Sequence, residues 1–210
     1  MGKTLANLNL PSRSPSALLL GRTRSSPLLC HLFVLTLFGL ATVVWMRPLL
    51  MHGADGVAVK PAGDQLWQVS LLEAQMRSLV SDPSTFFQGY FYYGMDNALF
   101  GSDLLLGLLL IFFPVQLVAG NADLSFNITW HVAFWLNPAL MYFAAYSLTR
   151  NHWAALTAGT IFGFGAIQIN YAHAHFQYAG AWWIPLTIFF SIRFVRSLRW
   201  KEFAGAVLSV

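Results

Sequence analysis

The sequence predicts an all-α fold: a polytopic transmembrane helix bundle with an extracytoplasmic loop domain that carries short amphipathic helices. Two observations support this prediction. Of the 210 residues, 57% are hydrophobic and only 10% are charged, whereas a soluble domain carries about 25% charged residues. The charged residues are also missing from long stretches, such as those between Arg24 and Arg47 and between Arg150 and Arg193. Each such stretch is long enough for one or two bilayer spans.

The N-terminal stretch, residues 1–27, is rich in Ser, Pro and Arg and contains no acidic residue. We expect it to form a disordered cytoplasmic tail, although a transit peptide has a similar composition. The first span is expected over residues 28–46, an apolar run that ends at Arg47 and Pro48. Since basic residues favour the cytoplasmic side of a membrane, the tail places the N-terminus in the cytoplasm.

Residues 47–101 are of mixed polarity with frequent Gly and Pro, which predicts an outer loop outside the membrane core. Within this loop a helix is expected over residues 64–80, ended by Asp82 and Pro83. Its apolar residues recur at spacings of three and four, as an amphipathic helix requires: Leu66, Val69, Leu72, Met76 and Leu79. The aromatic run over residues 86–93 is typical of a segment at the lipid headgroup level.

Further apolar segments follow the loop. Spans are expected over residues 128–148, 153–169 and 179–195. Residues 203–210 have the composition of a span that is cut short, so the chain is expected to be the N-terminal portion of a longer protein.

The segment over residues 104–118 is expected to be a short span or a re-entrant segment. It is short and contains Pro114. A full crossing there would put the basic cluster between Arg193 and Lys201 outside, against the preference of basic residues for the cytoplasm. If the segment only dips into the membrane, the cluster and Arg150 both fall inside.

Two carboxylates are candidates for chemistry. Asp64 begins the expected loop helix, where the helix dipole and the unpaired backbone N–H groups keep a carboxylate ionised. Such a group at the membrane surface can act as a general base or bind a divalent cation, but a plain N-cap aspartate has the same pattern. Asp103 directly precedes an apolar segment and is the candidate partner. Whether a metal is required does not follow from the sequence.

A polar stretch over residues 170–178 lies between two apolar runs and contains His173, His175 and Gln177. In an extended segment the two histidines would lie on one side and could hold a metal. The same side chains could instead contact a phosphate or sugar hydroxyl, or simply be polar residues at the membrane interface. Trp183 follows, as a tryptophan of the interfacial belt or as a face on which a sugar stacks.

Several other classes of protein are excluded. The chain has no Walker loop, dinucleotide fingerprint, nucleophile elbow or His-Glu-x-x-His motif. Its net charge of +4 comes from basic residues that flank apolar runs, which is typical of cytoplasmic membrane flanks and does not indicate a nucleic-acid partner.

Three motifs carry a resemblance to a known family. Gly63-Asp64 in the outer loop is followed by Trp67, Ser102-Asp103 precedes a Leu-rich run, and His175-Phe176-Gln177 precedes Trp183-Ile184-Pro185-Leu186. Over residues 28–201 the chain resembles bacterial polytopic glycosyltransferases of the GT-C superfamily, of the dolichyl-phosphate-mannose or RgtA/B/C/D-like type. The chain has a single acid at the Asp64 motif where the family usually has an adjacent pair, and it lacks the remaining helices.

The resemblance implies transfer of a sugar from a polyprenyl-phosphate donor to an acceptor on the outer face of the membrane. It implies that Asp64 serves as the base or as the contact of a divalent cation, and that Asp103 assists it. The substrate-binding residues would be His173, His175, Gln177, Trp67 and Trp183.

The resemblance also implies an integral protein of the bacterial plasma (inner) membrane, whose partners are membrane lipid and the lipid-linked donor. Two alternatives remain at this point. A transporter or flippase half would carry ionisable residues within its spans, and a non-catalytic membrane assembly protein would tolerate substitution of Asp64.

Overall fold

The computed structural model describes residues 27–56, 63–88, 94–171 and 175–209. Within these ranges the chain is all-helical and contains no strand, so the predicted all-α class is confirmed. The elements are α1 (Pro27–Trp45), α2 (Arg47–His52), α3 (Gly63–Ser81), η2 (Pro83–Thr85), η3 (Ala98–Gly101), α4 (Leu106–Ala119), α5 (Ala122–Thr149), α6 (His152–Phe164), α7 (Ala166–Tyr171), η4 (Phe176–Trp182), α8 (Trp183–Ser197) and α9 (Trp200–Leu208). The predicted tail up to residue 26, most of the aromatic run and His173 lie outside the described residues.

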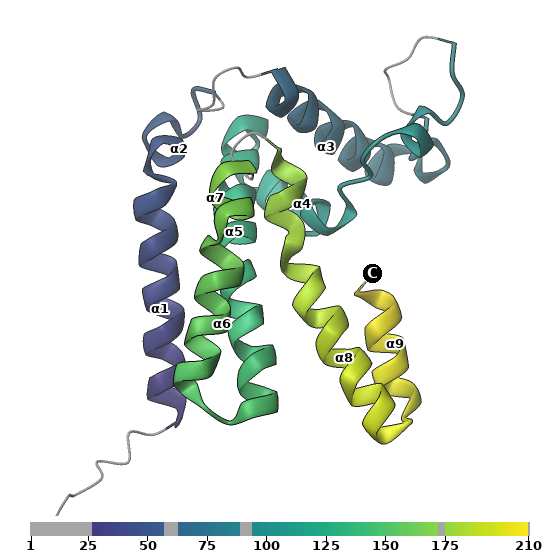
Figure 1. The fold of residues 1–210 in the computed structure, drawn as a ribbon. Helices are drawn as coiled ribbons and strands as arrows, with labels where there is room; N and C mark the ends of the chain where they lie inside the picture. Colours follow the sequence, from purple (N-terminus) through teal and green to yellow (C-terminus); the bar gives the residue numbers. More distant parts are fainter. Residues whose placement is uncertain (1–26, 57–62, 89–93, 172–174, 210) are drawn as a thin grey trace, which may run out of the picture.

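The helices run between two ends of the molecule (Figure 1). At one end, here called the proximal end, lie the start of α1, the turn between α5 and α6 and the turn between α8 and α9. At the opposite end, here called the distal end, lie α2, α3 and the η4 segment that leads into α8. The start of α1 and helix α3 therefore lie at opposite ends of the molecule.

Two of the described helices are long and apolar enough to cross a membrane: Pro27–Trp45, which is α1, and Phe176–Ser197, which joins η4 to α8. In each, only 17% of the apolar window is buried, so the rest of the described chain leaves most of their apolar surface uncovered. Because apolar surface is stabilised by removal from water, both helices need cover from lipid or protein. The crossing of the membrane by further segments stays a prediction.

The other predicted spans correspond to helices with different bounds. The expected span at 128–148 is part of the longer α5, which begins at Ala122 because the Asn121 side chain accepts a hydrogen bond from the Leu124 N–H at 2.8 Å. The expected span at 153–169 is divided at Gly165 into α6 and α7. A hydropathy pattern alone predicts neither the Asn121 cap nor the break at Gly165.

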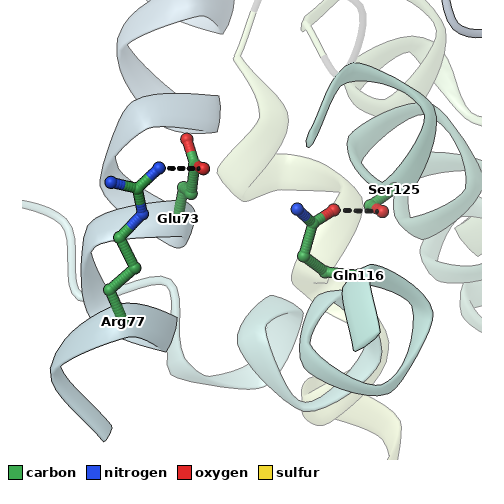
Figure 2. A network of polar contacts seen from close by, with 4 residues as sticks. All are labelled: Glu73, Arg77, Gln116 and Ser125. Atoms are coloured by element: carbon green, nitrogen blue, oxygen red, sulfur yellow. Dashed lines mark hydrogen bonds and ion pairs between the residues drawn. The ribbon is translucent and has the colours of Figure 1, made fainter. Parts of the chain in front are cut away.

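The segment predicted at 104–118 forms α4, a helix of 14 residues that contains Pro114. At about 1.5 Å per residue it is about 21 Å long, less than the hydrocarbon thickness of about 30 Å. Ser125 of α5 donates its hydroxyl proton to Oε1 of Gln116 at 2.6 Å, and Figure 2 shows how this bond joins α5 to α4. The short helix is therefore held against the longest one.

Helix α5 is the centre of the packing. Phe126, Trp130 and Phe134 are buried along it, and Phe176 of η4 lies against Phe126 with ring centroids 4.3 Å apart. The Phe176 ring also meets the Trp130 ring edge-on at 5.5 Å. These aromatic contacts fix η4, and with it the polar residues next to Phe176, on the distal half of α5.

Helix α6 approaches α5 closely at two glycines four residues apart. A Cβ atom on Gly159 would lie 2.7 Å from the Pro138 carbonyl oxygen, and one on Gly163 would lie 2.5 Å from the Pro138 ring. Small residues at this spacing are common where membrane helices pack backbone to backbone. The close packing of α6 on α5 thus depends on Gly159 and Gly163, which have no side chain.

Candidate functional site

Helix α3 confirms the helix that the sequence predicts over residues 64–80 and extends it by one residue at each end. The predicted apolar stripe is only partly correct. Val69 and Leu72 are buried, but the side chains of Leu66 and Leu79 are 52% and 43% exposed. The buried face of the helix instead carries three glutamines, Gln65, Gln68 and Gln75, since other segments supply polar contacts for it.

Asp64 lies in the first turn of α3 and faces His175, which precedes η4. Its Oδ2 is 3.6 Å from Nδ1 of His175, so the two groups form an ion pair when the imidazole is protonated. The Asp64 side chain is 67% exposed and the His175 side chain 42% exposed. A carboxylate in this position keeps most of its access to solvent and to a ligand.

Gln68, one helical turn after Asp64, makes the second contact between α3 and η4. Its Nε2 donates to Oε1 of Gln177 at 2.8 Å. Gln68 is buried while Gln177 is exposed, and Oε1 of Gln68 is buried without a hydrogen-bond partner among the described residues. Because an unpaired buried oxygen is costly, this acceptor is a point to which a ligand donor or a water could bind.

Gln177 also lines a small pocket together with Asp103 and Trp183. The pocket volume is about 190 Å³, below the usual range of about 300–1,000 Å³ for ligand pockets. Gly107 also lines the pocket, and a Cβ atom at this position would overlap the indole nitrogen of Trp183. Glycine is therefore required at this position if the Trp183 ring is to keep its place.

The structure brings most of the predicted site residues together at the distal end. Asp64 contacts His175, and Gln177 connects the α3 side of this group to the pocket that holds Asp103 and Trp183.

The two remaining predicted residues are placed differently. Trp67 is half-buried, packs against the hydrophobic core and does not line the pocket. His173 lies outside the described residues, so its expected role stays a prediction.

Three residues of this site were not predicted: Gln68, Gln75 and Gly107. Gln75 donates from Nε2 to the carbonyl oxygen of Leu104 at 2.7 Å and so ties α3 to the segment that bears Asp103. The spacing of the glutamines on one face of a helix was a usable signal for the first two. No local pattern identifies Gly107, because its neighbour Trp183 is far along the chain.

Among the described residues, no group of three or more His, Cys, Asp or Glu side chains could hold a metal ion. A divalent cation at Asp64 would therefore take its other ligands from a substrate phosphate and from water, as Mg²⁺ commonly does. The chemistry available from the chain itself is a solvated carboxylate, an imidazole, amide groups and an indole face.

Comparisons with known proteins identify no relative. No family model matches the chain, and no match was found among curated proteins or among solved structures.

Proposed function

We propose that the chain is part of an integral membrane glycosyltransferase that moves a sugar from a polyprenyl-phosphate donor to an acceptor on the outer face of the membrane. The observation that carries the proposal is the clustering of polar groups from three separate segments. Asp64 pairs with His175, while Gln177 shares a pocket with Asp103 and Trp183. These residue types can act as a general base and can bind the hydroxyl groups of a sugar.

In the proposed reaction, the Asp64 carboxylate accepts the proton of an acceptor hydroxyl group. The hydroxyl oxygen then forms a bond to the anomeric carbon of the sugar. The bond between that carbon and the donor phosphate breaks, and the lipid phosphate leaves with the electron pair. General base catalysis of this kind contributes about 10²–10⁴-fold to the rate. His175, 3.6 Å from Asp64, would hold the carboxylate in position and stabilise it when protonated.

The pocket residues supply the binding of the sugar in this scheme. The Asp103 carboxylate can accept hydrogen bonds from sugar hydroxyl groups, and the Gln177 amide can accept or donate them. The Trp183 indole offers an apolar face on which a sugar ring can stack. Since the pocket is small, we propose that it receives one edge of the sugar, with the remainder held by the exposed residues around Asp64.

The position of the site supports an outward-facing orientation. The site lies at the distal end, whereas Arg150 and the basic residues from 193 to 201 lie in or near the turns between α5 and α6 and between α8 and α9, at the proximal end (Figure 1). Basic residues favour the cytoplasmic side. The proposed protein therefore has its N-terminus in the cytoplasm and its site at the outer surface of the membrane; the bacterial plasma membrane is the location that the resemblance to GT-C enzymes implies.

The test is a transfer assay on the full-length protein in proteoliposomes, with radiolabelled sugar on a polyprenyl phosphate. Asp64→Asn should lower the transfer rate by about 10²-fold or more. Asp96→Asn is the matched control, because Asp96 is an exposed acid of the same outer loop that contacts none of the site residues named above. Equal activity of parent and Asp64→Asn would refute the role of Asp64.

The same preparation distinguishes transfer from transport. A flippase would move the lipid donor between leaflets without breaking the bond between sugar and phosphate. Movement of intact donor in the absence of any labelled product would overturn the proposal in favour of a transporter.

A further inference from the structure

A second and larger pocket lies at the proximal end, between the start of α1 and the turn that joins α5 to α6. Its volume is about 870 Å³, within the range of about 300–1,000 Å³ for ligand sites. One part of its wall is apolar, with Phe33, Val34 and Leu156. The polar part is formed at the turn by Arg150 and His152. The pocket thus has an apolar part and a polar part, which would match the two parts of an amphipathic ligand.

The polar part has an uncompensated positive charge. Arg150 is the one permanently charged residue in the lining, which includes no acid. No ion pair or hydrogen bond joins its guanidinium to another described residue, and the side chain is exposed. Its backbone is fixed, because the Arg150 N–H donates to the carbonyl oxygen of Tyr146 at 2.8 Å and ends α5. A fixed backbone with an available guanidinium favours an anionic group with phosphate geometry.

His152 is held in place at the same rim. Its Nδ1 is 2.8 Å from the hydroxyl of Tyr142, and Nδ1 of His31 is 2.8 Å from the same oxygen. Tyr142 is fully buried, and its hydroxyl donates to one ring and accepts from the other. Both Nδ1 atoms are thereby occupied. When Tyr142 donates to His152, the neutral His152 ring carries its proton on Nε2, where it can donate to a ligand.

We propose that this pocket binds an anionic glycerophospholipid, with the headgroup phosphate at Arg150 and an acyl chain along the apolar wall. The lack of acids in the lining and the positive charge of Arg150 determine the sign of the headgroup. The apolar wall belongs partly to α1, a helix able to cross a membrane, so the occupant comes from the surrounding bilayer. The inference requires that the chain resides in a membrane and does not depend on sugar transfer.

The test is native mass spectrometry of the purified full chain, titrated with phosphatidylglycerol and with phosphatidylcholine of identical acyl chains. Phosphatidylglycerol should be retained in preference to phosphatidylcholine. Arg150→Asn should weaken its retention about fivefold, since a basic residue near an anionic headgroup contributes about 1 kcal/mol. Asparagine is chosen because Arg150 has φ 53°, a left-handed conformation in which Asn is enriched among non-glycine residues.

Arg199→Asn is the matched control. Arg199 is also a basic residue at a helix boundary of the proximal end, at the N-cap of α9, where asparagine is favoured. It should retain phosphatidylglycerol as the parent does. Arg150→Lys keeps the charge but loses the planar guanidinium, so its retention of phosphatidylglycerol should fall between that of the parent and that of Arg150→Asn. It therefore tests the site even if Arg150→Asn folds poorly.

Three results would overturn the proposal. Equal retention of the two lipids would show that headgroup charge has no effect. Equal losses in Arg150→Asn and Arg199→Asn would show a general attraction to the basic surface. Binding of glycerol 3-phosphate as tight as that of phosphatidylglycerol would show a site for a soluble phosphate in which the apolar wall has no part.

Discussion

The two ends of the molecule use histidine in opposite ways. At the distal end the His175 side chain is 42% exposed and lies beside the still more exposed carboxylate of Asp64. At the proximal end His31 and His152 share the hydroxyl of Tyr142, whose side chain is fully buried. Polar groups that are buried and paired within the protein specify the packing. Polar groups that remain exposed keep their capacity to bind or to react.

The aromatic residues differ in the same sense. At the proximal end the Tyr146 ring lies 4.7 Å from the His31 ring and 4.4 Å from the His152 ring. Tyr146 therefore joins His31, His152 and Tyr142 in one packed group, here called the proximal cluster. At the distal end Trp183 has one face on the Trp182 ring at 3.9 Å and also lines an open pocket. The comparison predicts that substitutions in the buried proximal cluster around Tyr142 act on stability, whereas substitution of the exposed distal carboxylate of Asp64 acts on function.

The largest expected effect is that of Tyr142→Ala. It removes a fully buried aromatic ring, which costs about 3–5 kcal/mol, and leaves two imidazole nitrogens unpaired. Tyr142→Phe removes only the hydroxyl and should cost about 1–3 kcal/mol. Unfolding in detergent micelles, followed by circular dichroism, measures both. A loss below about 1 kcal/mol for Tyr142→Ala would show that the proximal cluster does not stabilise the fold.

Gly107→Ala should have the next largest effect, and it acts at the distal pocket. The added Cβ would overlap the Trp183 indole, and overpacking of this kind costs about 1–3 kcal/mol. The control is Gly180→Ala in the same pocket, where a Cβ would lie 3.5 Å from Leu108 in ordinary contact. The unfolding midpoint and the rate of the proposed sugar transfer should both fall for Gly107→Ala and change little for Gly180→Ala. Equal behaviour of the two variants would contradict the close approach of Trp183.

The bond between Gln68 and Gln177 should contribute a smaller amount. A double-mutant cycle with Gln68→Ala and Gln177→Ala should give a coupling free energy of about 0.5–1.5 kcal/mol, the net value of one hydrogen bond. The free energy of unfolding is measured for the two single variants, the double variant and the parent. A coupling indistinguishable from zero would mean that α3 and η4 are not joined by this bond in the bilayer.

The smallest effect is expected for the ion pair between Glu73 and Arg77 on the exposed side of α3, drawn in Figure 2. The atoms are 2.6 Å apart, but the Arg77 side chain is 73% exposed. A pair of this type contributes about 0.3–0.5 kcal/mol and is weakened by salt. Glu73→Gln should therefore change the unfolding free energy by no more than this amount and leave transfer unaltered. A loss of transfer would extend the functional site along α3.

The sequence determined where the helices lie along the chain better than it determined which residues they contact in the fold. The predicted first span at 28–46 agrees with α1 to within one residue at each end, because a long apolar run bounded by prolines is a local property. The loop helix at 64–80 was found from periodicity, and Asp82 indeed caps the following turn by accepting from the Ser84 N–H. Asp64, Asp103 and the polar stretch over residues 170–178 were singled out from their residue types and positions, and the structure brings most of the described ones together.

Only the tertiary structure decided which surfaces are buried and which side chains meet. Leu66 and Leu79 belong to the predicted apolar stripe but are exposed, while Gln68 is buried because Gln177, 109 residues away in the chain, accepts its hydrogen bond. The contact between His31 and Tyr142 spans 111 residues. Periodicity and hydropathy describe a segment by itself, whereas burial and pairing depend on partners that folding brings from elsewhere in the chain.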